Sequence, residues 1–179
     1  MQIERLEGRR LLSVSPIGVA RPRPVDTHIV ATQSGTTLTL DNANSVQIVD
    51  NGGGSVTVYD KSRTGSDPLF RRDYAGVSSL VVNGTKRDDN ISAALTTVDA
   101  TINGGGGSDG FPVSVVDITD DAGNVLVPAT SDVVINAGPG ADILSGNNFG
   151  SGTYVFNGQG GRDSLILIGE AGHNIIFNQ

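Results

Sequence analysis

Five glycine-rich tracts with a shared pattern constrain the fold of this 179-residue chain more than any other feature. Each tract begins with an apolar residue and one spacer residue, which a glycine-rich turn follows. Asp or Asn closes the turn, and a second spacer and another apolar residue come after it. The tracts span residues 82–91, 102–111, 135–144, 156–165 and 167–176. A repeat of this kind cannot bury its apolar face alone, so its copies stack on one another. The pattern therefore predicts an elongated repeat fold.

The aspartates that close these turns recur at intervals suited to stacked rungs of about 20 residues. Asp89, Asp109, Asp142 and Asp163 are separated in turn by 20, 33 and 21 residues. The long interval predicts a rung with an inserted loop, which the polar, turn-forming segment 117–124 would provide. Asn174 follows Asp163 by only 11 residues, so we expect it at the opposite edge of the stack. Successive turns would lie roughly 4.8 Å apart.

Short runs of β-branched residues lie between the turns and predict strands with one buried face. These runs are 36–40, 55–59, 77–82, 113–116 and 132–135. Segment 45–49, followed by Asn51 and three glycines, is interpreted as an earlier rung that lacks the aspartate. The chain has 25 glycines and 16 Asp but only 3 Glu and 2 Lys, which favours turns and strands over helices. We therefore expect an all-β fold.

The apolar positions of the repeat predict the core. Stacked copies would align them in columns inside the fold, at Val82, Ile91, Ile102, Phe111, Ile135, Leu144, Phe156, Leu165 and Ile176. The irregular segment 61–74 is expected to form an exposed loop, with Leu69, Phe70 and Tyr74 folded back onto the core. An alternative interpretation makes this loop a contact surface for a partner.

The template resembles the nonapeptide G-G-x-G-x-D-x-U-x of the repeats-in-toxin (haemolysin-type) calcium-binding family, where U is a large apolar residue. One copy matches every marked position, with Gly104, Gly105, Gly107, Asp109 and Phe111. Two further copies match in part, through Gly138, Gly140, Asp142 and Leu144 and through Gly158, Gly161, Asp163 and Leu165. The first copy keeps Gly84, Asp89 and Ile91, and the last keeps Gly169, Gly172 and Ile176, with Asn174 in place of the aspartate.

This resemblance implies a parallel β-helix or β-roll solenoid in which the glycine-aspartate turns stack and calcium ions (Ca2+) lie between them. The implied metal-binding residues are Asp89, Gly104, Gly105, Gly107, Asp109, Gly138, Gly140, Asp142, Gly158, Gly161 and Asp163. This chain lacks the uninterrupted nine-residue tandem of the family, so two full rows of ions are not expected.

The chemistry of calcium accounts for these residue types. Calcium takes six to eight hard oxygen ligands, and glycine adopts positive φ without steric cost, so a glycine-rich turn can aim its carbonyls inward. Two aspartates on stacked turns would repel by about 3 kcal/mol at an effective dielectric of about 20, and a divalent ion converts this repulsion into attraction. At the first turn Lys86 and Arg87 oppose a cation, and a left-handed Thr85 or Arg87 would be strained. The alternative interpretation is that the turns are corners that need no metal.

The first 24 residues are expected to form a basic tag and linker ahead of a β-solenoid domain at 25–179. They hold five Arg and two Glu, a net charge of +3, which leaves −10 for the domain. Segment 5–13 resembles the LEPR-XLL tag at the start of large bacterial surface or secreted proteins, with Gly8 in place of proline. The matching residues are Leu6, Glu7, Arg9, Leu11, Leu12 and Ser13. The alternatives are a weak signal peptide and an amphipathic turn without a targeting role.

Several function classes are disfavoured. The acidic domain has too few cations to neutralise nucleic-acid phosphates, and no run of 20 apolar residues predicts a transmembrane span. The two histidines, His28 and His173, form no H-E-x-x-H motif, and neither a G-x-S-x-G elbow nor a P-loop occurs. We therefore do not expect an enzyme.

The sequence favours a calcium-binding, non-catalytic module that is extracellular or at the bacterial cell surface, with cell-surface or matrix components as partners. The alternative is a metal-independent structural or adhesive β-helix that binds a glycan or protein. A carbohydrate-active enzyme is a more remote third hypothesis.

Overall fold

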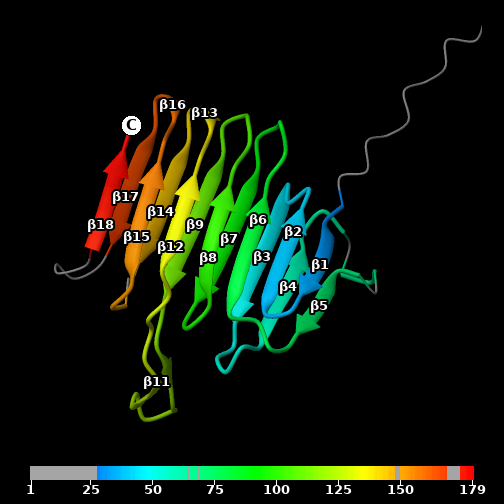
Figure 1. Ribbon diagram of the computed structural model, residues 1–179, viewed down its shortest axis with the longest axis vertical. Coiled ribbons are helices and arrows are strands. Elements are labelled where there is room, and N and C mark those ends of the chain that lie inside the picture. The colour runs from blue at the N-terminus through cyan, green and yellow to red at the C-terminus, as the bar shows by residue number, and fades with distance from the viewer. Residues whose placement is uncertain (1–27, 64, 68, 148–149, 169–173) are drawn as a thin grey trace, which may run out of the picture.

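A computed structural model describes residues 28–63, 65–67, 69–147, 150–168 and 174–179. Most of its strands form two facing seven-stranded sheets (Figure 1). Two small two-stranded sheets accompany them, one of β10 (Ile118–Thr119) and β11 (Val125–Val127) and one of β13 (Pro139–Gly140) and β16 (Gly160–Gly161), which pair in parallel. Sheet A contains, in spatial order, β1 (Val30–Ser34), β2 (Thr37–Asp41), β6 (Ser79–Asn83), β8 (Asp99–Asn103), β12 (Val133–Asn136), β15 (Thr153–Asn157) and β18 (Asn174–Asn178). Sheet B contains β5 (Arg71–Tyr74), β4 (Val56–Asp60), β3 (Ser45–Asp50), β7 (Asn90–Leu95), β9 (Gly110–Val115), β14 (Ile143–Asn147) and β17 (Ser164–Ile168). The tag-like segment 1–24, Gly169, Gly172 and His173 lie outside the described residues.

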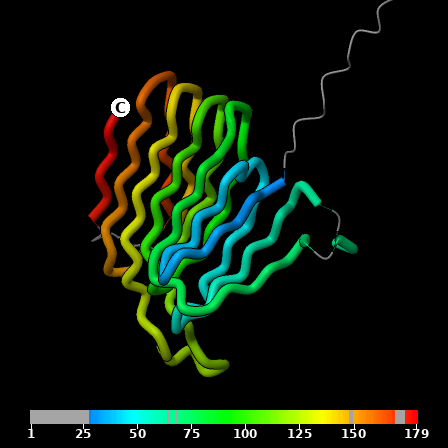
Figure 2. The backbone as a smooth tube through the Cα atoms, turned by 45° about the vertical axis from the view of Figure 1, so that its right-hand side comes forward, coloured from blue at the N-terminus to red at the C-terminus, as the bar shows by residue number. Residues whose placement is uncertain are grey.

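From β6 onward the chain alternates between the sheets, and each strand pairs in parallel with the equivalent strand of the previous rung. Turns 84–89, 104–109, 137–142 and 158–163 join sheet A to sheet B along one side of the molecule, here called the aspartate edge. The return turns lie along the opposite edge, where Asn174 begins β18, as its spacing predicts. The expected all-β architecture with stacked rungs is confirmed in this coarse form, a β-solenoid-like parallel fold (Figure 2).

The insertion in the long rung is also confirmed. Between β9 and β12 the chain forms a small antiparallel hairpin of β10 and β11, which projects from the opposite edge (Figure 1). Asp120 stabilises its tip by accepting backbone N–H bonds from Ala122 at 2.9 Å and Asn124 at 2.8 Å. The five predicted strand runs correspond to β2, β4, β6, β9 and β12.

The interpretation of segment 45–54 as a rung is correct for its strand and wrong for its glycine turn. β3 pairs in parallel with β7 of the following rung, but on its other side it pairs antiparallel with β4, and β4 pairs antiparallel with β5. The chain reverses at Gly52, Gly53 and Gly54, whose φ values of 81°, 60° and 75° are left-handed. Three such glycines make a tight hairpin possible, so the chain leaves the first rung as an antiparallel meander instead of turning into another rung.

Part of the expected loop 61–74 is likewise a strand, β5. Phe70 does fold back, since its ring lies edge-on to Tyr59 with centroids 5.9 Å apart, and Tyr74 packs against the core. Leu69 does not fold back, because 45% of its surface is exposed.

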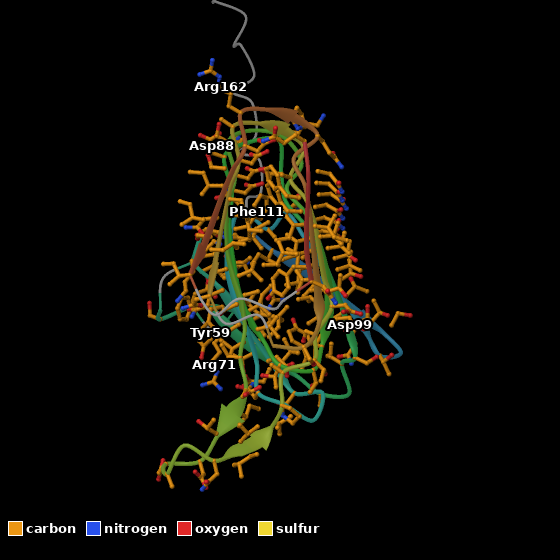
Figure 3. All side chains as sticks on the ribbon, turned by 90° about the vertical axis from the view of Figure 1, so that its left-hand side faces the viewer. Tyr59, Arg71, Asp88, Asp99, Phe111 and Arg162 are labelled. Atoms are coloured by element: carbon orange, nitrogen blue, oxygen red, sulfur yellow. The ribbon has the colours of Figure 1, made fainter. Side chains whose placement is uncertain are left out.

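The core consists of side-chain columns between the sheets, and Figure 3 shows Phe111 in that position. One column is in register through Leu40, Val82, Ile102, Ile135, Phe156 and Phe177. Every predicted core position up to Phe156 is at most 1% exposed, and Leu165 packs against them from the last rung. Ile176 is an error in the prediction, because it is 47% exposed and its neighbour Phe177 occupies the column.

A ladder of side-chain amides runs along sheet A, where its strands enter the aspartate edge. Each Asn donates from Nδ2 to Oδ1 of the previous rung's residue, in the series Asp41, Asn83, Asn103, Asn136, Asn157 and Asn178, at 2.8–2.9 Å. The ladder satisfies polar groups that stacking half-buries, and it fixes the register of successive rungs.

Candidate functional site

The four predicted aspartates come together in one column along the aspartate edge. Asp109 Oδ1 accepts the backbone N–H of Asp89 at 2.8 Å, Asp142 Oδ1 that of Asp109 at 2.7 Å, and Asp163 Oδ1 that of Asp142 at 3.1 Å. Each carboxylate therefore reaches back to the preceding rung. We call Asp89, Asp109, Asp142 and Asp163 the carboxylate column.

The glycines of the turns serve two purposes. Gly105, Gly107, Gly138 and Gly161 have left-handed φ values of 100°, 120°, 97° and 126°. Gly104 and Gly158 do not have left-handed φ values, but a Cβ would collide with a carboxylate at each position. At Gly104 the carboxylate is that of Asp109, and at Gly158 it is that of Asp163. The turns are thus shaped around the carboxylates that they carry.

Strain was expected at Thr85 and Arg87, and this expectation is wrong. Among the described non-glycine residues only Asn42 and Gln159 have positive φ, at 58° and 69°. Gln159 is the residue that replaces the second glycine of its copy, so the left-handed conformation is retained there without glycine.

The second carboxylate oxygens distinguish the turns from one another. Asp109 Oδ2 and Asp142 Oδ2 are buried and have no hydrogen-bond partner among the described residues. Asp89, in contrast, accepts bonds from Thr85 N at 2.5 Å, Thr85 Oγ1 at 2.8 Å and Asn44 Nδ2 at 2.9 Å. Burying an oxygen without a partner costs about 1–3 kcal/mol, and more for a charged group. Asp109 and Asp142 therefore need a proton or a cation, whereas Asp89 does not.

Burial also changes the acidity of this pair. Loss of water raises the pKa of Asp109 from 3.8 to about 6, and the nearby Asp89, Asp142 and Asp88 carboxylates add to the rise. Burial is again the main cause of the raised pKa of Asp142; the hydrogen bond from the Asp109 N–H opposes the rise, and repulsion from Asp163 adds to it. Both shifts report that the negative charge is poorly compensated by the protein alone.

We expect this charge to destabilise the metal-free protein as the pH rises. The pKa of Asp109 is about 6 in the folded protein and 3.8 as the reference value. The folded state therefore binds more protons between these pH values, so the stabilising contribution of Asp109 is complete below pH 3.8 and is lost as the pH rises through 6. The full shift corresponds to about 3 kcal/mol, which solvent screening at the turn reduces to about 1–2 kcal/mol.

Urea unfolding in a chelator at about pH 4.5 and about pH 7, for wild type and Asp109→Asn, measures this contribution. Between about pH 4.5 and about pH 7 the wild type should lose about 1–2 kcal/mol more unfolding free energy than the variant, which has no carboxylate at this position. Identical pH dependence in both proteins would show that ionisation of Asp109 does not destabilise the folded protein.

Calcium fits this chemistry. It prefers anionic and carbonyl oxygens, and the column offers two buried anionic oxygens beside turns that expose backbone carbonyls to one another. Among the described residues, no three His, Cys, Asp or Glu side chains gather into a group that could hold a metal ion. An ion held here would therefore depend on turn carbonyls as well as on Asp109 and Asp142.

The opposite edge carries carboxylates that sequence reasoning missed. Asp99 Oδ1 accepts the N–H of Asp132 at 2.9 Å, and Asp132 Oδ1 accepts the N–H of Thr153 at 2.7 Å. The signal was present, because Asp99 and Asp132 repeat the 33-residue interval that separates Asp109 from Asp142. Both are exposed, so water can satisfy their second oxygens. They provide a matched comparison for the buried column.

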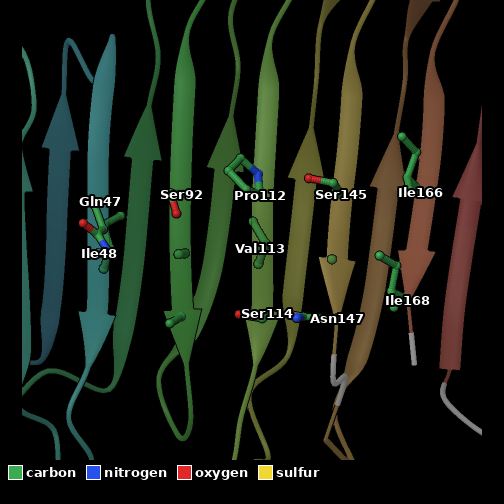
Figure 4. A pocket seen from close by; sticks show the side chains of 13 residues that line it. Gln47, Ile48, Ser92, Pro112, Val113, Ser114, Ser145, Asn147, Ile166 and Ile168 are labelled. Atoms are coloured by element: carbon green, nitrogen blue, oxygen red, sulfur yellow. The ribbon is translucent and has the colours of Figure 1, made fainter. Parts of the chain in front are cut away.

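The outer face of sheet B holds a groove of about 340 Å³ that crosses several strands (Figure 4). Its lining is uncharged and mixed. The hydroxyl and amide groups of Gln47, Ser92, Ser114, Ser145 and Asn147 lie among apolar residues, and the groove ends at Ile166 and Ile168. This lining offers hydroxyl and amide groups for hydrogen bonding.

The chain matches no protein-family model, no curated protein and no solved structure. Within the described ranges there is no helix long and apolar enough to cross a membrane.

Proposed function

We propose that this chain is a calcium-binding β-solenoid module without catalytic activity, which works outside the bacterial cell or at its surface. The unpartnered, buried Oδ2 atoms of Asp109 and Asp142 are the observation that carries the proposal. A divalent cation between turns 104–109 and 137–142 and between turns 137–142 and 158–163 would neutralise the column. The glycines of these turns would contribute carbonyl oxygens.

The same energetics support the proposed extracellular location. A cation that offsets a buried carboxylate pair links binding to folding, so the module becomes rigid where calcium is plentiful. The resemblance of segment 5–13 to a tag of bacterial surface proteins supports export. Cell-surface or matrix components are the proposed partners.

Calcium is expected to stabilise the protein saturably, by about 2.7 kcal/mol when free calcium reaches about 100 times its Kd. Calorimetry and far-ultraviolet circular dichroism of the chelated full chain, titrated with calcium and separately with magnesium, measure this. Magnesium should be much less effective, because it demands a rigid octahedral site and sheds its water reluctantly.

Asp109→Asn tests the role of the column. The amide keeps an oxygen that can accept the Asp89 N–H bond but removes the charge, so most of the calcium effect should disappear while the metal-free protein stays folded. Asp99→Asn is the matched control, because Asp99 Oδ1 likewise accepts the backbone N–H of an aspartate in an adjacent rung, Asp132, but at the exposed edge. If both variants respond to calcium like the wild type, the column is not the binding site.

A metal-independent scaffold is the second candidate, and the bonds of the Oδ1 atoms favour it. These bonds link the turns without any ion, as the exposed pair Asp99 and Asp132 does at the other edge. A fully folded chelated protein that is indifferent to millimolar calcium would favour the scaffold. Binding to a glycan or protein would then be sought in the groove of sheet B.

A further inference from the structure

The two ends of the stack are built differently (Figure 1). One end is closed by the antiparallel strands β1 and β5, and β5 carries Arg71, Arg72 and Asp73. The other end consists of β17 and β18, which among the described residues pair only with the preceding rung. An uncovered strand edge offers its backbone groups to another strand, and repeat folds normally cover it with a polar cap.

The terminal rung lacks the charges that protect such edges. β17 reads Ser-Leu-Ile-Leu-Ile and β18 reads Asn-Ile-Ile-Phe-Asn. Its outward side chains Ile166, Ile168 and Ile176 are 51%, 70% and 47% exposed. Its inward side chains, Leu165, Leu167, Ile175 and Phe177, are only partly buried against the core.

Backbone hydrogen bonds show which residues of this rung face outward along the stack. Ser164 N donates to Asp142 O at 2.8 Å, and Asn178 O accepts from Gly158 N at 2.8 Å. In a parallel strand the N–H and C=O of alternate residues point to the same neighbour. The backbone N–H and C=O groups of residues 164, 166 and 168 on β17, and of 174, 176 and 178 on β18, therefore point to the previous rung. The uncovered side receives the backbone N–H and C=O groups of Leu165 and Leu167 on β17 and of Ile175 and Phe177 on β18.

The two strands have a common centre of symmetry. Each has five residues, and β17 and β18 belong to facing sheets whose strands run in opposite directions (Figure 4). Asn157 and Ser164 flank turn 158–163, and Asn178 is in register with Asn157, so Ser164 and Asn178 lie at the same height. Ile166 and Ile176 are each two residues further from this edge, so both are at mid-strand and at the same height. A single twofold axis can therefore pass through both.

We propose that two copies of this chain pair end to end through β17 and β18 about that axis, which extends both sheets antiparallel across the dimer. Leu165 pairs with Leu167 of the second copy, and Ile175 pairs with Phe177, through two N–H···O bonds per pair. These pairs place core side chains opposite core side chains. Ile166 and Ile176 each face their own symmetry mate in non-hydrogen-bonded positions.

A second copy suits this surface for electrostatic reasons. The chain has a net charge of −7, so two copies repel through most of their surface, but β17 and β18 contain no charged residue. The contact is small, because strands of five residues are about 17 Å long and facing sheets are about 10 Å apart. Standard interfaces bury about 800 Å² on each partner, so we expect a dimer that dissociates in the micromolar range.

Sedimentation velocity over about 1–500 µM protein should show a concentration-dependent shift from the 18.4 kDa monomer to a species of twice that mass. Ile166→Lys with Ile176→Lys should abolish it, because each lysine would face its own mate. Ile143→Lys is the control, since Ile143 is 46% exposed on the same face but lies one rung inside the edge. A monomer at all concentrations would overturn the proposal, as would equal dissociation by the control.

Disulfide capture tests the register directly, because the chain has no cysteine of its own. Residues in a non-hydrogen-bonded antiparallel pair have Cα atoms about 4.5 Å apart, within the range of a disulfide. Under mild oxidation Ile166→Cys should form covalent dimers in high yield and Ile143→Cys should not. Equal yields from both variants would mean that association, if present, does not use this axis.

Discussion

Replacing Gly105 with alanine is expected to lower the free energy of unfolding by about 3 kcal/mol or more, although the side chain gains only one methyl group. Gly105 has a left-handed φ of 100°, and a Cβ there would collide with the carbonyl oxygen of Thr85 in the preceding turn. The stack leaves no room to relax, because both atoms belong to the backbone of adjacent rungs. Urea unfolding in a chelator measures the loss separately from any effect of calcium.

Gly106→Ala is the matched control for this prediction. A Cβ at Gly106 would have no heavy atom closer than 3.9 Å, and its φ is not left-handed. Alanine there should change stability by less than about 1 kcal/mol, and a small gain is expected because the unfolded chain loses freedom. If the two variants proved equally stable, the turns would not approach as closely as described.

The regular rungs could be predicted from the sequence because stacking imposes a fixed interval on the chain. Asp109 follows Asp89 by 20 residues and occupies the equivalent position one rung later, where its carboxylate accepts the backbone N–H of Asp89. An insertion changes the interval without disturbing the stack, since the hairpin after β9 leaves from the edge and returns to it. Periodicity therefore reports the architecture even where individual copies are degenerate.

The antiparallel end could not be predicted in this way. Three glycines after a strand fit the turn of a rung and the turn of a hairpin equally well, and only pairing with β4 decides between them. Ile176 failed for a related reason. The template was continued through a tract that crosses the opposite edge, so its register is one residue off, and a one-residue shift exchanges inside for outside.

Within the candidate site the sequence predicted the aspartates, but it did not predict that the two oxygens of one carboxylate are bonded differently. That Oδ1 bonds to the neighbouring backbone, while Oδ2 of Asp109 and Asp142 remains unpartnered, depends on how two turns stack. The Asn ladder was missed although Asn83, Asn103 and Asn136 occupy the same template position. Within one copy this position has no bonding partner and is taken for a spacer, because the amide hydrogen bonds form only between residues of different copies.

Phe156→Ala is expected to cost about 3–5 kcal/mol, the other large effect among single substitutions. Its side chain is fully buried and contacts two rings, Phe111 edge-on at 6.4 Å and Phe177 stacked at 5.3 Å between centroids. Removing it opens a cavity beneath the terminal rung, and each rung depends on its neighbours for burial. We therefore expect β17 and β18 to lose protection from hydrogen exchange before the rest of the molecule.

Phe177→Ala separates packing in the stack from packing across the proposed dimer. Phe177 is only partly buried in one chain, so its loss should cost the monomer much less than the loss of Phe156. In the dimer, however, it would lie opposite Ile175 of the second copy, so the same change should weaken association by at least tenfold, which corresponds to about 1.4 kcal/mol. Equal costs for the two phenylalanines in dilute monomer would mean that the last rung is already covered within one chain. Unchanged association of Phe177→Ala would mean that the second copy does not pack on this column.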